Sequence, residues 1–69
     1  MTYTQTTTEN GVKVDIQYYL DYGIGLWKAF YTQSANRIIC EGACDFDNHK
    51  SFIQDVKEII DFEIFGEIN

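Results

Sequence analysis

The dipeptide Asn10-Gly11 limits how this chain can fold more than any other feature of the sequence. A two-residue type I′ hairpin turn needs positive φ at both central residues, and Asn-Gly adopts that conformation readily. After the turn, apolar and polar residues alternate through 12–20, which is typical of a strand with one buried face. Before it, the threonine-rich segment 3–9 has high strand propensity and little to bury. We therefore expect a hairpin in which 3–9 is an edge strand and 12–20 a half-buried strand.

A second turn is expected at Tyr22-Gly23, followed by a strand over 24–33. With these two residues as the loop, one face of the new hairpin is apolar throughout, because directly opposite residues share a face. The predicted pairs are Leu20 with Gly25, Tyr18 with Trp27, Ile16 with Ala29 and Val14 with Tyr31. The opposite, open face of the sheet would then present an apolar patch to solvent. Its members are Tyr19, Ile24, Leu26 and Phe30.

The next segment predicts a fourth strand. A turn at 34–36 leads into a strand over 37–42 that turns Ile38 and Cys40 toward the core. Residues 42–45 are then expected to form a connection.

The last third of the chain predicts one helix, over 48–62, with Asp47 or Asn48 as its N-cap. Apolar residues at helical spacing form a stripe that would face the sheet. They are Phe52, Ile53, Val56, Ile59 and Ile60. Continuing the helix would bring Glu63 into this stripe, so we expect the helix to end near that residue.

These elements predict an α+β fold, a four-stranded antiparallel meander with one C-terminal helix packed on one face, in a single domain over 1–69. A chain of 69 residues supports one modest core, which excludes a multidomain enzyme. No apolar run approaches the roughly 20 residues of a membrane span, and the polar start does not resemble a signal peptide. We therefore expect a cytoplasmic protein.

The formal net charge of −6 lies entirely after residue 40, where eight acidic side chains face only Lys50 and Lys57. Such a half-molecule repels nucleic-acid phosphates and anionic lipids, whose binding needs clustered lysine and arginine. Direct binding to nucleic acid or to a membrane is therefore not expected.

Cys40, Cys44 and His49 could supply three zinc ligands, with Asp45 or Asp47 as a fourth. The pattern lacks the paired ligand knuckles of structural zinc sites, and a cysteine that points into the core is more often a small buried apolar residue. Cys44 and His49 could also act as nucleophile and base, but the sequence shows no oxyanion site. We therefore predict neither a metal, nor a cofactor, nor a catalytic residue. Whether the two thiols are free or bridged stays open.

The acidic residues and the apolar patch together indicate a small, non-enzymatic protein-binding module that inhibits or regulates a partner. The acidic candidates are Asp45, Asp47, Asp55, Glu58, Asp61, Glu63 and Glu67. Dense carboxylates can imitate nucleic-acid phosphates and attract a basic, nucleic-acid-binding protein. In size and charge alone, this is analogous to small phage inhibitors of host nucleases such as anti-CRISPR proteins. The alternative is a homo-oligomeric structural subunit, for example a homodimer, that associates through the open sheet face or the edge strand.

Overall fold

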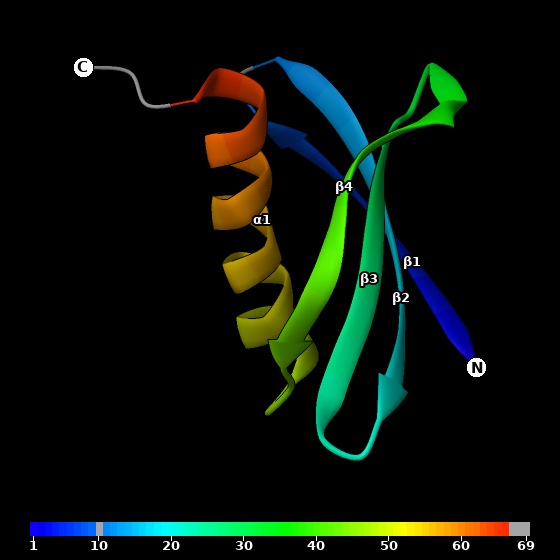
Figure 1. Cartoon of the computed structure of the whole chain (residues 1–69), viewed down its shortest axis with the longest axis vertical. Coiled ribbons are helices and arrows are strands. Elements are labelled where there is room, and N and C mark those ends of the chain that lie inside the picture. The colour runs from blue at the N-terminus through cyan, green and yellow to red at the C-terminus, as the bar shows by residue number, and fades with distance from the viewer. Residues whose placement is uncertain (10, 67–69) are drawn as a thin grey trace.

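Four strands follow one another along the chain and pair in the same order (Figure 1). They are β1 (Thr2–Glu9), β2 (Val12–Asp21), β3 (Ile24–Tyr31) and β4 (Ser34–Asp45), and α1 (His49–Phe65) follows them. The structure is a computed structural model and describes residues 1–9 and 11–66. All neighbouring strands are antiparallel, so the predicted α+β meander with a C-terminal helix is confirmed.

The predicted register between β2 and β3 is confirmed at all four pairs, from Leu20 with Gly25 to Val14 with Tyr31. The loop between them consists of Tyr22 and Gly23, whose φ angles of 49° and 80° are both positive. A primed two-residue turn requires this conformation, and it fixes the register of the flanking strands. At the first turn, Gly11 has a φ of 85°, while the expectation for Asn10 lies outside the described residues.

The third turn was predicted at 34–36, and this prediction is wrong. The turn is Thr32-Gln33, because Tyr31 already pairs with Ser34, and the strand predicted over 24–33 ends at Tyr31. Two irregularities follow in β4, because the partner residue moves from Ser34 at Tyr31 to Ile38 at Phe30, and from Ile38 to Cys40 at Ala29, where Ile39 is bulged. A bulge places an extra residue in one strand and changes which side chains point inward.

The inward residues of β4 therefore differ in part from the prediction. Ile38 is 50% exposed on the open face, and Ile39 packs against the core instead, together with Cys40. The strand predicted over 37–42 also continues to Asp45, so 42–45 is not a connection. Gly42 belongs in this strand because it faces the Trp27 indole, where a Cβ would lie 3.3 Å from Cζ2.

α1 starts where the sequence predicts and ends later. Asn48 is the N-cap, and its side chain accepts a hydrogen bond from the backbone N–H of Ser51 at 2.8 Å. The helix, predicted to end at 62, continues to Phe65 and is closed by Gly66, which has a φ of 65° and donates its N–H to the carbonyl of Phe62 at 2.7 Å.

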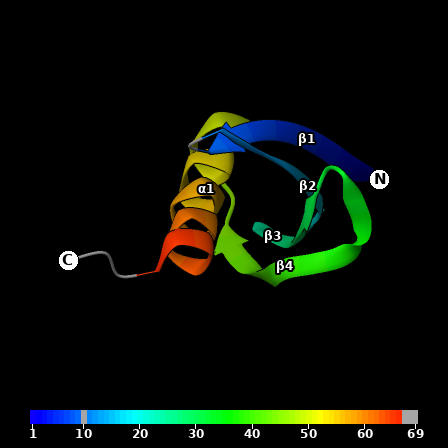
Figure 2. The ribbon, with the colours of Figure 1, turned by 90° about the horizontal axis from the view of Figure 1, so that it is seen from above.

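The core lies between α1 and the inner face of the sheet. The sheet curls so that its edge strands β1 and β4 lie on either side of the helix (Figure 2). Phe52 sits directly over Gly25, where a side chain would collide with its ring. The buried apolar residues are Val14, Ile16, Tyr18, Trp27, Ala29, Phe52, Val56 and Ile60. The opposite face of the sheet is left without a covering element among the described residues.

Candidate functional site

The register gathers the predicted apolar patch on the face of the sheet that α1 leaves open. Tyr19 is 49% exposed and Ile24 is 42% exposed, while Leu26 and Phe30 are half-buried. Ile38 lies opposite Phe30 and extends the patch onto β4. Sequence reasoning missed Ile38 because it placed no bulge in this strand.

A groove of about 570 Å³ crosses the open face. Its floor is formed by Tyr18, Trp27 and Gly42, which are cross-strand partners. Because the register directs their side chains to the core face, these residues line the groove with their backbone. On β4, Ala43 offers only a methyl group to the open face beside Leu26. The remaining lining residues are Thr2, Gln17, Tyr19, Leu26, Lys28, Glu41 and Ala43.

The chemistry of this groove suits a side chain that is partly apolar and partly charged. Tyr19 and Leu26 are direct cross-strand partners and form an apolar wall. Lys28 and Glu41 are partners on the next pair of strands and place opposite charges at the rim. A concave, mostly apolar site with a few polar groups is the usual form of a binding pocket. Arginine and lysine can lay their apolar stems on such a wall while their charge stays at the rim, here beside Glu41.

The predicted acidic candidates are distributed over several surfaces. Asp45 pairs with Ile24 and therefore lies on the open face of the sheet. Asp55 and Glu58 are exposed on α1, in the layer on the other side of the sheet. Glu67 lies outside the described residues.

Two further acidic candidates, Asp47 and Glu63, are exposed at opposite ends of the helix. With a rise of about 1.5 Å per residue, roughly 20 Å of helix separates them. Burial raises the pKa of the Cys40 thiol, and the negative charge of Glu63 raises it further. Glu63 therefore lies on the β4 side of α1, and a partner must cover most of the helix to contact both carboxylates.

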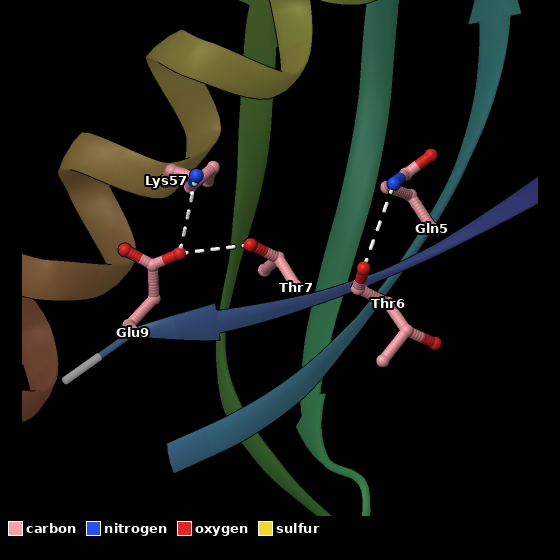
Figure 3. A network of polar contacts seen from close by, with 5 residues as sticks. All are labelled: Gln5, Thr6, Thr7, Glu9 and Lys57. Atoms are coloured by element: carbon pink, nitrogen blue, oxygen red, sulfur yellow. Dashed lines mark hydrogen bonds and ion pairs between the residues drawn. The ribbon is translucent and has the colours of Figure 1, made fainter. Parts of the chain in front are cut away.

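Asp61, the remaining acidic candidate, belongs to a polar cluster between β1 and α1. Lys57 Nζ lies 3.5 Å from Glu9 Oε2, and the Thr7 hydroxyl donates to the same oxygen at 2.8 Å (Figure 3). Burial raises the pKa of the Asp61 carboxyl, and the neighbouring Glu9 carboxyl raises it further. Its Oδ1 atom is buried and has no hydrogen-bond partner among the described residues. Asp61 therefore contributes to the contact between β1 and α1 more than to an exposed acidic surface.

The exposed side of α1 also carries two large apolar residues that sequence reasoning did not assign to a surface. Phe62 is 61% exposed and Ile59 is 41% exposed. At about 100° per residue, these two side chains lie on the same side of the helix as Asp55 and Glu58. The predicted stripe placed Ile59 in the core, and the predicted helix end left Phe62 without an assigned face.

Cys40, Cys44 and His49, which were considered for metal binding or catalysis, pack beside the core, whereas Asp45 and Asp47 are exposed. Cys40 and Cys44 are free, half-buried thiols next to the core. His49 Nδ1 lies 2.7 Å from the Tyr18 hydroxyl, and the His49 ring packs edge-on against Tyr3 and Phe46. Within residues 1–9 and 11–66, no three histidine, cysteine, aspartate or glutamate side chains gather as a metal site.

Comparison with protein-family models, curated proteins and solved structures found no match. Nowhere in the described part of the chain is a helix both long enough and apolar enough to cross a membrane.

Proposed function

We propose that this chain is a non-enzymatic protein-binding module that inhibits or regulates a partner by covering part of the partner's surface. The observation that carries the proposal is the apolar groove on the open sheet face, with Tyr19 and Leu26 along one wall. Exposed apolar residues that are contiguous and rimmed by polar ones commonly mark protein contacts. The accessible surface is 4809 Å², so a standard interface of about 800 Å² per partner would cover roughly a sixth of it.

The charges around the groove indicate a basic partner. Among the described residues, the register places two lysines, Lys13 and Lys28, and four carboxylates on the open face. The carboxylates are Asp15, Asp21, Glu41 and Asp45. A second copy of this chain would bring two acidic faces together, each on a chain of net charge −6. We therefore assign the groove to an arginine or lysine side chain of a partner protein, next to apolar residues that contact Tyr19 and Leu26.

Selection of a random peptide display library on the immobilised protein tests this assignment. Enriched peptides should combine arginine or lysine with a large apolar residue. They should lose at least about tenfold in affinity on Leu26→Glu, which places a charge in the apolar wall. Glu41→Gln should weaken the same peptides about two- to fivefold, with less effect at high salt, because a rim charge contributes modestly. Enrichment of peptides without basic residues, or binding that both substitutions leave unchanged, would refute the assignment.

Gln33→Glu is the matched control, because it adds the same charge at an exposed turn residue that belongs neither to the groove nor to α1. It should leave selection at the groove unchanged. Sedimentation of the chain alone tests the alternative of a homo-oligomeric subunit. A dimer that Leu26→Glu dissociates would assign the open face to self-association in place of a basic partner.

The exposed side of α1 is a second candidate surface for the same function. Asp55 and Glu58 flank the exposed Ile59 and Phe62, an arrangement that offers both charge and apolar contact to a basic protein. A nucleic-acid-binding protein is the partner of this kind that a phosphate-like acidic surface would attract. Binding of such a protein should fall with salt and after Asp55→Lys together with Glu58→Lys. Binding that is indifferent to both would exclude this surface.

A further inference from the structure

The outer edge of β1 offers unpaired backbone groups. β1 ends the sheet, and within the described part of the chain only β2 pairs with it. Backbone groups of successive residues in an antiparallel strand point alternately to its two sides. The Gln5 side chain reaches the Thr6 carbonyl at 3.5 Å, so this carbonyl is accessible to a donor other than β2 (Figure 3). The alternation then directs the N–H and C=O groups of Thr2, Thr4, Thr6 and Thr8 outward.

This edge lacks the features by which edge strands normally avoid further pairing. Over its eight residues, β1 has no proline, lysine, arginine or bulge, and its only charged side chain, Glu9, turns to Lys57. The opposite edge strand, β4, contains a bulge and charged side chains such as Arg37 and Glu41. β1 is therefore the edge at which a further strand can be added.

A groove of about 310 Å³ lies between β1 and α1, on the core side of this edge. It is lined by Gln5, His49, Lys50, Ile53, Gln54 and Lys57. No carboxylate is among these described lining residues, although the chain has eleven acidic side chains. Lys50 forms no ion pair with any described residue, whereas Lys57 is paired with Glu9. Within the described residues, the free positive charge of the groove is therefore that of Lys50, since Lys57 is paired with Glu9 and lies beside Asp61.

We propose that β1 and this groove bind an extended acidic segment of a partner protein, which adds to the sheet as a fifth strand. The new strand would lie about 4.8 Å from β1, with alternate side chains about 6.7 Å apart facing the groove. One inward carboxylate would pair with Lys50, and a second, four residues or about 13 Å along the strand, would compete with Glu9 for Lys57, roughly 10 Å from Lys50 along the helix. The inward position between them would face Ile53. The recognised pattern is acidic–any–apolar–any–acidic.

A second copy of this chain fits the groove less well. A β1 strand added to β1 would direct Tyr3, Gln5 and Thr7 into the groove, none of which carries a charge for Lys50. Its one carboxylate, Glu9, is already held by Lys57 and Thr7 within its own chain. The groove's positive charge is complementary to an acidic segment of another protein.

Titration of the full chain with terminally blocked nine-residue peptides tests the proposal. The probe peptide has threonine at the positions that face outward. Its three central inward positions are glutamate, valine and glutamate, and the control peptide has glutamine in place of each glutamate. The glutamate peptide should bind about five- to tenfold more tightly at low salt, and the difference should shrink as salt screens the charges. Amide shifts in β1, followed by NMR, should accompany binding.

Two variants separate strand addition from simple charge attraction. Thr4→Pro removes an outward N–H, which an edge strand tolerates, and should abolish binding, whereas Thr4→Val keeps the N–H and should retain it. Lys50→Glu, at an exposed site, should weaken the glutamate peptide at least fivefold and leave the glutamine peptide unchanged. NMR spectra of the free variants verify their folding.

The proposal is overturned if both peptides bind equally, or if folded Thr4→Pro binds like the wild type. It is also overturned if the chain alone forms a dimer that Thr4→Pro dissociates, because a second copy would then occupy the edge. Leu26→Glu, on the open face, should not change peptide binding. Failure of the open-face assignment and failure of this one are therefore distinguishable.

Discussion

Replacing Gly25 with alanine tests how closely the helix is seated on the sheet. A Cβ at this position would lie 2.6 Å from Cζ and 2.9 Å from Cδ1 of Phe52, and closer still to Cε1. Carbon atoms in contact prefer about 3.5–4.0 Å, so the ring would have to move by about 1 Å. Phe52 has little room to do so, because it is fully buried and packs against the rings of Tyr18 and Phe46, with centroids 4.7 and 5.6 Å away.

The expected net cost of Gly25→Ala is about 2 kcal/mol. Overpacking a core typically costs roughly 1–3 kcal/mol, and the smaller conformational entropy of unfolded alanine offsets about 0.5–1 kcal/mol. A domain of this size has roughly 3–10 kcal/mol of total stability, so the loss is a large share. Urea unfolding followed by Trp27 fluorescence and far-UV circular dichroism measures it, because Trp27 is buried in the same core.

A double-mutant cycle with Phe52→Leu isolates the contact. Leucine removes the colliding part of the ring, so the double variant should be about 1–2 kcal/mol more stable than the sum of the single effects implies. Gly42→Ala is the control, since its Cβ would lie 3.3 Å from the Trp27 ring and should cost less than Gly25→Ala. Unchanged stability of Gly25→Ala, or additive effects in the cycle, would show that α1 does not sit against β3 in this way.

Three further outcomes follow from individual side chains. The pKa of Asp61 is raised above its ordinary value of 3.8, so this group favours the folded state at low pH and that contribution is lost as pH rises. The Tm of Asp61→Asn minus that of the wild type should therefore rise between about pH 3 and pH 7. A Tm difference that stays constant over this range would contradict this. Asn48→Ala should cost about 1 kcal/mol in urea unfolding through loss of the N-cap, whereas Asp47→Ala should be nearly neutral; equal effects would refute the assignment of the cap. Glu63→Gln should lower the pKa of Cys40 and speed its alkylation by iodoacetamide at a fixed pH. An unchanged alkylation rate would show that the charge of Glu63 does not act on the Cys40 thiol.

The fold could be predicted where turn chemistry and strand alternation agree. Gly23 takes the positive φ of a two-residue loop without strain, and together with the alternation of the flanking strands this fixes the register from Leu20 to Val14. The same register places Tyr19 and Leu26 on the open face, so that part of the candidate site was also predictable.

The remainder of the site depends on features that carry no distinct sequence signal. A bulge in β4 adds one residue without requiring a particular residue type, so the exposure of Ile38 could not be predicted. Glycine is common in turns, yet Gly42 lies within β4, where it makes room for the Trp27 indole of the neighbouring strand. The contact of Glu9 with Lys57 joins the two ends of the chain and follows only from how α1 lies across the sheet.

The placement of the charges changes what the net charge of −6 implies for binding. Lys50 and Lys57 are seven residues apart, which puts them within about 20° of each other on the side of α1 that faces β1. Asp55 lies roughly 140–160° away from them around the helix, but Asp61 lies within about 20° of Lys50 and beside Lys57, so the lysine side of the helix is mixed in charge. A uniform acidic end would attract basic partners only. If both proposed interactions occur, a basic protein on the outer side of α1 and an acidic strand beside β1 would contact different exposed charged residues, so both surfaces would be occupied at once.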